Sequence, residues 1–438
     1  MLSPLNNSVY RRLFAAQVVA LLGTGLATVA LGLLAHRLGG ASAGEILGIA
    51  FAIKMVAYVA VAPFASALAA NLPRKTLLIG LDLVRAGVAA LLPFVAEAWQ
   101  VYALMTVLYV ASAAFTPAFQ AMIPDILTDE REYTKALSLS RLASDLENVA
   151  SPVIAAVLLA FVAYNDLFAG TAIGFFLSAL LVLSAELRTV RVTQQKTFVQ
   201  RLTAGFRLFA LTPRLRALVA ISLATAAGGA MVFINTVVIV QTQLSLSQQH
   251  TAWALAVFGL GSMSAAMLVP RLLEDMPDRI LMILGGAMMT TGLIGGFLHR
   301  HGGYFELLVL WFDIGVGYSL TLTPASRALR RSASPEERSA LFAAYFALSH
   351  VCWLIAYPVA GFVSSTWGTS AAFLVLGILS AIGSLVTWLL WPAHDPEILP
   401  HHHDDLPADH PHLAEHGLKH EHAVVIDVWH PKWPVSSK

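Results

Sequence analysis

The 438-residue chain has little charge, since only 12% of its residues are Asp, Glu, Lys or Arg. An ordinary soluble domain has about 25%. Hydrophobic residues make up 57% of the chain and the mean hydropathy is +0.71, so most of the surface must face something other than water. The net charge of +1 gives no broad basic surface for nucleic acid. Cys352 is the sole cysteine, which excludes an internal disulfide.

Several motifs of enzymes and ATP-driven pumps are also missing. The chain has no G-x-x-x-x-G-K-S/T phosphate loop, no H-E-x-x-H zinc motif and no G-x-S-x-G nucleophile turn. We therefore expect neither an enzyme nor an ATP-driven protein. A proton gradient is the expected source of energy.

Long apolar runs fill most of the chain. About 20 apolar residues are needed to cross a hydrocarbon core of roughly 30 Å. The run from Leu13 to Ala35 is too long for a signal-peptide core and is expected to be the first membrane helix. Twelve runs are predicted to span the membrane, at residues 12–36, 45–70, 76–96, 99–122, 137–163, 167–187, 215–240, 250–270, 280–298, 304–325, 339–364 and 369–391.

Basic residues are distributed unequally between the two sets of connections. With the N-terminus inside, 22 of the 27 Lys and Arg residues fall on the cytoplasmic side and two, Arg37 and Arg300, on the other. Because basic residues near helix ends are retained in the cytoplasm, we expect a multi-pass protein of the bacterial inner membrane with both termini cytoplasmic.

The two halves of the chain resemble each other at an offset of about 206 residues. The segment from Thr116 matches that from Thr323, and Asn71-Leu-Pro-Arg matches Asp275-Met-Pro-Asp. Parallel repeats are typical of transporters that rock around a midplane site. The predicted fold is an all-α polytopic membrane protein of two six-helix repeats, divided into residues 1–188, an amphipathic cytoplasmic linker at 189–214, residues 215–392 and a cytoplasmic tail at 393–438.

The first 392 residues resemble the major facilitator superfamily. The family's G-x-L-A-D-R-x-G-R-R loop appears as Ser66-Ala-Leu-Ala-Ala-Asn-Leu-Pro-Arg74-Lys75, with Ala70 and Asn71 in place of the usual acid and base. Asp82 and Arg85 in the third span look like the remaining acid and base of this region. The resemblance implies alternating access, with gating by Arg74, Lys75, Asp82 and Arg85.

Ionisable and polar residues within the spans are few, and such residues are functional candidates by default. The fifth span has Asp145, Glu147 and Asn148, although Arg141 and Asp145 stand four apart and could form an intrahelical ion pair. Imidazole and carboxylate groups suit a borderline divalent metal, and a thiolate suits a softer one. A transport cavity is predicted from Lys54, Asp145, Glu147, Asn148, Asp313, His350 and Cys352.

The tail contains ten of the 15 histidines, interleaved with Asp and Glu. Neutral imidazoles on such a segment can ligate nickel, cobalt, zinc or copper. Within this tail the predicted metal ligands are His401, His402, His403, His410, His412, His416, His420 and His422.

This combination resembles bacterial nickel-resistance exporters, which implies proton-driven export of Ni²⁺, or of cobalt or zinc, by a monomer. The metal would be substrate, and no bound cofactor is expected. Export of a drug or siderophore is the first alternative, favoured by an aromatic cavity and a dispensable tail. A membrane metal sensor or buffer is the second.

Overall fold

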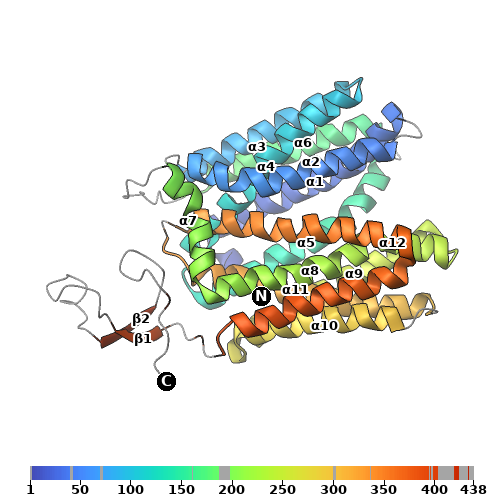
Figure 1. Ribbon diagram of the computed structural model, residues 1–438. Helices are drawn as coiled ribbons and strands as arrows, with labels where there is room; N and C mark the ends of the chain where they lie inside the picture. The colour runs from blue at the N-terminus through green and yellow to red at the C-terminus, as the bar shows by residue number, and fades with distance from the viewer. Residues whose placement is uncertain are drawn as a thin grey trace.

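A computed structural model describes residues 2–39, 43–69, 73–159, 161–186, 198–298, 302–335, 337–393, 395, 398–402, 419–423 and 433. Long helices form almost all of the described chain (Figure 1). This arrangement confirms the predicted all-helical membrane fold. One addition is a small hairpin in the tail, whose strands β1 (Ile398–His402) and β2 (Lys419–Ala423) pair antiparallel.

The first six long helices follow the predicted runs closely. A short 3-10 helix, η1 (Ser3–Asn6), precedes them, and η3 (Leu92–Phe94) extends the third. These helices are α1 (Ser8–Gly39), α2 (Ala43–Ala69), α3 (Arg74–Leu91), α4 (Ala98–Ile126), α5 (Glu130–Leu159) and α6 (Tyr164–Ser184).

The second half begins after the linker helix. The helices are α7 (Phe198–Leu211), α8 (Pro213–Val237) with the π-helical turn η4 (Val238–Gln243), α9 (Gln248–Asp275), α10 (Asp278–Leu298), α11 (Tyr304–Arg330) and α12 (Arg338–Leu390). Helix α12 contains the last two predicted runs, which meet at Gly368, where φ is +86°. Nine helices within the described residues are long and apolar enough to span a membrane.

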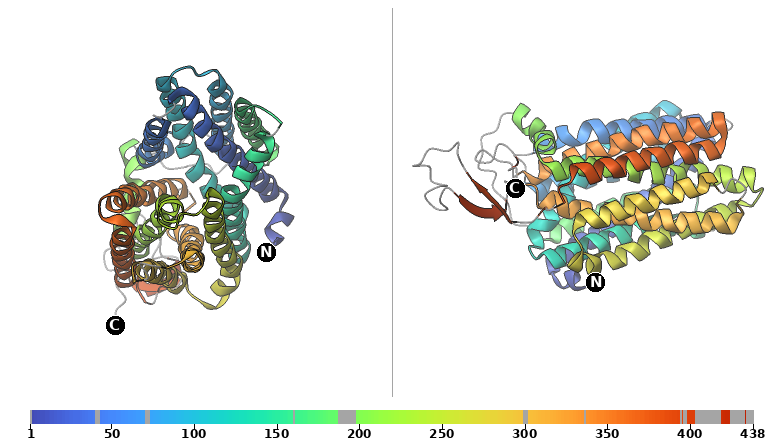
Figure 2. Two further views of the ribbon diagram at one scale, coloured as in Figure 1. Left: turned by 90° about the vertical axis from the view of Figure 1, so that its right-hand side faces the viewer. Right: turned by 60° about the horizontal axis from the view of Figure 1, so that its bottom comes forward.

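The helices pack as two groups, seen end-on on the left of Figure 2. Helices α1 to α6 enclose one set of buried apolar residues, and α8 to α12 enclose another. Glycines allow close helix contacts in both groups. A Cβ at Gly174 of α6 would lie 3.1 Å from the Val19 carbonyl oxygen of α1, and one at Gly261 of α9 would collide with the Phe312 carbonyl oxygen of α11. Small residues serve this close approach in membrane proteins, where no hydrophobic force drives helices together.

Helix α7 marks one end of the bundle, which we call the linker end. The start of α1 and the tail hairpin lie at this end (Figures 1 and 2). Helix α7 packs against α2, α8 and α12, and the ring of Phe209 stacks on that of Tyr345. Which compartment the linker end faces stays a prediction from the basic residues.

Candidate functional site

The two helix groups are joined at the linker end by charged side chains. Glu130, the first residue of α5, accepts hydrogen bonds from both Arg327 and Arg330 of α11. Nearby, the Tyr133 hydroxyl donates to the Ser326 carbonyl oxygen at 3.1 Å. One carboxylate therefore holds two guanidinium groups of the other half, and charge-assisted bonds of this kind are about twice as strong as neutral ones.

A second carboxylate makes a similar link. Asp125 at the end of α4 accepts a hydrogen bond from Arg74 of α3 at 2.6 Å and another from Arg338 at the start of α12. Arg74 also donates to the Pro335 carbonyl oxygen of the other half at 3.3 Å. We call Arg74, Asp125, Glu130, Arg327, Arg330 and Arg338 the linker-end gate. Their side chains are 14–31% exposed, so water screens these contacts only in part.

The C-terminal half supports this gate through Asp278 at the start of α10. The Asp278 carboxylate is buried, lies 3.6 Å from Arg327 and accepts a hydrogen bond from Arg331 at 3.2 Å. Arg327 thus contacts Asp278 in its own half and Glu130 in the other.

Of the four residues predicted to gate, only Arg74 has a hydrogen bond to the other half among the described residues. The Lys75 ammonium donates to the Ala185 carbonyl oxygen at 2.8 Å, within its own half. Asp82 and Arg85 form a buried ion pair, with the Ser178 hydroxyl 2.8 Å from Asp82 and the Arg85 guanidinium between the rings of Phe115 and Phe175. These last two residues stabilise the packing of α3, α4 and α6 and lie away from the gate.

The prediction omitted most of the gate, including Asp125, Glu130, Arg327, Arg330 and Arg338. The signal was present in the two repeat segments that begin at Thr116 and Thr323. The first copy continues with Asp125 and Glu130, and the second has Arg327, Arg330 and Arg338 among its charged residues. Because the repeat places both segments at the same end of the two halves, acidic residues of the first copy can meet arginines of the second.

Farther along the interface, aromatic residues of both halves meet around His350. The His350 ring of α12 lies 4.2 Å from the Phe346 ring and 4.9 Å from the Tyr58 ring of α2. Its Nδ1 is 2.7 Å from the Phe346 carbonyl oxygen, so Nδ1 is the donor. The Lys54 ammonium lies 5.6 Å from the centre of the Tyr58 ring and 6.0 Å from that of Tyr109. Among the described residues, Lys54 has no carboxylate partner.

A second aromatic group continues this surface. The guanidinium of Arg141 in α5 lies 4.8 Å from the Tyr318 ring of α11 and 3.3 Å from the Ser262 hydroxyl of α9. The Trp353 ring lies 6.3 Å from that of Tyr318 and 5.0 Å from that of Tyr357. Both cations come from the N-terminal half, and Arg141 lies against a ring of the C-terminal half.

Among the predicted ligands whose side chains the structure describes, His350, Cys352 and Asp313 do not converge. Cys352 is buried, and its thiol faces the Val219 carbonyl oxygen of α8 at 3.7 Å, because two residues of helix turn it by about 200° from His350. Asp313 faces Gly292 of α10. Within the described part of the chain, no group of three or more His, Cys, Asp or Glu side chains could hold a metal ion.

Other predicted site residues fall partly or wholly outside the described structure. Asp145, Glu147 and Asn148 belong to α5, but their side chains are not among those described. His403, His410, His412 and His416 lie outside the described residues altogether. In the hairpin backbone, His401 pairs with His420, His402 with Lys419, and Leu399 with His422.

Known proteins with similar sequences are membrane transporters. A family model described as Major Facilitator Superfamily matches residues 13–247 and 217–429. An uncharacterized MFS-type transporter of Bacillus subtilis, YfiS, is 24% identical over 358 residues, which cover 78% of this chain and 83% of the relative. Macrolide efflux protein A of Enterococcus faecalis is 28% identical over 138 residues, covering 30% of this chain and 41% of the relative. Neither name includes a metal.

Solved structures share the fold at low sequence identity. The human organic anion transporter MFSD10 (TETRAN) superposes with a TM-score of 0.74 and 13% identity, covering 86% of this chain and 98% of its own. The proton:xylose symporter XylE superposes with a TM-score of 0.71 and 12% identity, covering 88% and 97%. With a family model matching most of its length and two repeats of membrane helices, this chain belongs to the major facilitator superfamily and is a transporter, not an enzyme.

Proposed function

We propose that this transporter exports an organic molecule by alternating access. The observation that carries the proposal is the aromatic surface at the interface, where Tyr58 of one half meets His350 of the other and the rings around Trp353 extend it. Aromatic and apolar surfaces with a few placed polar groups are typical of small-molecule sites. The partial sequence similarity to macrolide efflux proteins supports an organic substrate.

Alternating access requires that the aromatic surface be reached from one side at a time. The linker-end gate joins the halves on one side of it, through Glu130 and Asp125. If this end is cytoplasmic, as the basic residues predict, the described form is closed to the cytoplasm. Breaking these contacts would admit substrate from inside, and an ion gradient would supply the energy for export.

A second candidate is export of Ni²⁺ or a similar divalent metal as substrate. The backbone pairing of His401 with His420 favours it, because it brings two predicted ligands from distant parts of the tail to one register position. In this second candidate the tail binds the metal first and passes it to the transport path. Protons then replace the metal on its ligands, because protonated ligands lose metal affinity.

Everted membrane vesicles test both candidates in one experiment. The full-length protein and a form truncated after Pro392 are given a proton gradient and supplied with a macrolide, a cationic dye or radioactive nickel. Proton-driven uptake of an organic compound by both forms supports the proposal. Uptake of nickel alone, lost on truncation, would replace it with metal export.

Two matched substitutions locate the organic site. Phe346→Ala removes a ring that contacts Tyr58 and His350, whereas Phe176→Ala removes a ring of α6 that is 50% exposed. An aromatic contact contributes about 0.5–1.5 kcal/mol, so we expect Phe346→Ala to raise KM roughly three- to tenfold. Phe176→Ala should leave KM unchanged. Equal KM values for the two variants would place the substrate elsewhere.

A further inference from the structure

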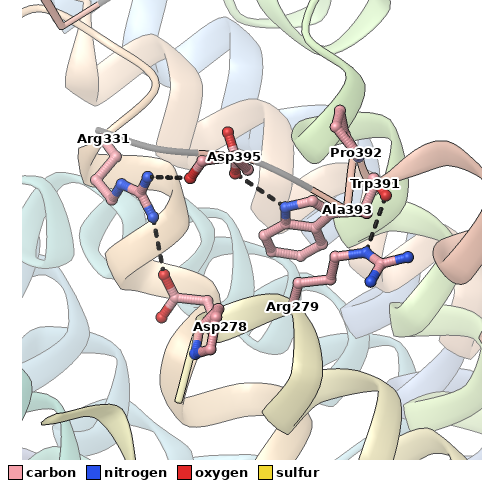
Figure 3. Close-up of a pocket in the computed structure, with 8 residues that line it drawn as sticks. Asp278, Arg279, Arg331, Trp391, Pro392, Ala393 and Asp395 are labelled. Carbon is pink, nitrogen blue, oxygen red and sulfur yellow. Dashed lines mark hydrogen bonds and ion pairs between the residues drawn. The ribbon is translucent and has the colours of Figure 1, made fainter. Parts of the chain in front are cut away.

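The segment that follows α12 is bound to the linker end by buried charged groups. The Trp391 side chain is 1% exposed, and its indole nitrogen donates to the Asp395 carboxylate at 2.9 Å (Figure 3). Arg214 at the start of α8 lies 3.3 Å from the same carboxylate. The side chains of Asp395 and Arg214 are 8% and 4% exposed, so this ion pair is shielded from solvent.

A residue close to the end of the chain adds to this arrangement. Trp433 lies with its ring 4.9 Å from the Arg214 guanidinium and packs against the apolar core of the C-terminal half. Arg214 also donates to the Ser332 hydroxyl at 2.8 Å and to the Arg331 carbonyl oxygen at 3.2 Å, both just after α11. The tail is thus attached at two points that are distant in sequence and share one arginine.

The same contacts lead to the gate. Arg331 donates to the Asp395 carbonyl oxygen at 3.1 Å and to the Asp278 carboxylate at 3.2 Å (Figure 3). Asp278 in turn lies 3.6 Å from Arg327, which binds Glu130 across the interface. The path from the tail to the other half therefore has four steps, each of which is an ion pair or a charge-assisted hydrogen bond.

We propose that Asp395 and Trp433 form a latch that stabilises the closed linker end. With the latch bound, Arg331 and the end of α11 are fixed, so Arg327 and Arg330 are already placed to bind Glu130. Groups ordered in advance lose less entropy when they bind. Release of the tail frees the end of α11, weakens the contacts to Glu130 and favours the open linker end. The tail thereby regulates how often this end opens, whatever the substrate.

The distance between spin labels on the two halves, measured in the full-length protein, tests whether the latch keeps the linker end closed. Spin labels are attached after Arg131→Cys in α5 and Arg271→Cys in α9, two exposed positions of opposite halves, in a Cys352→Ala background. Asp395→Asn keeps an acceptor oxygen but removes the negative charge that pairs with Arg214, and loss of such a charge-assisted contact shifts an equilibrium by about tenfold. We expect Asp395→Asn to raise the ratio of open to closed linker ends roughly tenfold, and Trp433→Ala to raise it several-fold.

Asp275→Asn is the matched control, since Asp275 is exposed at the same end and makes no hydrogen bond or ion pair within the described residues. This variant should keep the original distance distribution.

In a Glu130→Gln background, Asp395→Asn should have a smaller effect than alone, because both act on the same contact. The latch is refuted if Asp395→Asn and Trp433→Ala both give the distribution of Asp275→Asn. An effect of Asp395→Asn that is undiminished in the Glu130→Gln background would refute the path through Arg327.

Discussion

The two halves carry opposite charges at matching positions of the linker end. Arg74 follows Pro73 at the start of α3, and in the second repeat Asp278 follows Pro277 at the start of α10. Arg74 pairs with Asp125 at the end of α4, whereas Asp278 pairs with Arg327 and Arg331 at the end of α11. The difference teaches that each half keeps an acid–base pair at this end, but the third helix of the repeat carries the base in one half and the acid in the other.

A second difference lies deeper in the same pair of helices. Asp82 and Arg85 form a buried ion pair in α3, while the positions 204 residues later in α10 are Gly286 and Met289. The N-terminal half thus depends on a polar contact where the C-terminal half uses close packing.

The largest effect is expected from removing the buried ion pair of α3, and it should appear as a loss of stability. Asp82→Ala leaves Arg85 buried without its carboxylate, and loss of one partner of a buried pair costs about 3–5 kcal/mol. Met289→Leu in the other half conserves volume and should cost under about 1.5 kcal/mol. Thermal unfolding in detergent measures both. Equal stability of the two variants would mean that the buried pair contributes nothing.

The next effect concerns the gate itself. Glu130→Lys places a cation against Arg327 and Arg330, and truncating one member of an interfacial charge pair already costs about 2–5 kcal/mol. We expect the linker end to open in most molecules, as measured by the distance between labels in α5 and α9. Adding Arg330→Glu should restore part of the closed population. A closed Glu130→Lys protein would show that the contacts of Glu130 are not needed to join the halves.

A smaller effect separates the two arginines on Asp125. Arg338 links this carboxylate to the other half, whereas Arg74 belongs to the same half and reaches across only to a backbone oxygen. Arg338→Gln should therefore open the linker end more than Arg74→Gln, by about 1 kcal/mol. The same distance measurement compares them, and the reverse order would assign the cross-half contact to Arg74.

The smallest effect is expected at Lys75, which the sequence motif assigned to the gate. Its ammonium bonds only to the Ala185 carbonyl oxygen among the described residues. Lys75→Gln should change the open population by less than about 0.5 kcal/mol. A shift in the open population as large as that of Arg338→Gln would show that Lys75 also stabilises the closed linker end.

Apolar runs and repeats predicted the fold because a bilayer imposes span length and helical geometry directly on the sequence. The site was harder to predict. Arg74 was identified from the family loop, but Glu130 and Arg330 lie 200 residues apart, and only the packing of α5 against α11 brings them together. His350 was singled out as polar, yet its aromatic neighbour Tyr58 comes from the other half and gave no local signal.

The most direct test of charge complementarity is a double-mutant cycle on Glu130 and Arg330. The open fraction is measured by the label distance in Glu130→Gln, in Arg330→Gln and in the combined variant. If the two side chains close the linker end together, the combined effect falls short of the sum of the single effects by at least about 1 kcal/mol. Effects that add within about 0.3 kcal/mol would contradict the account, because the two charges would then act independently.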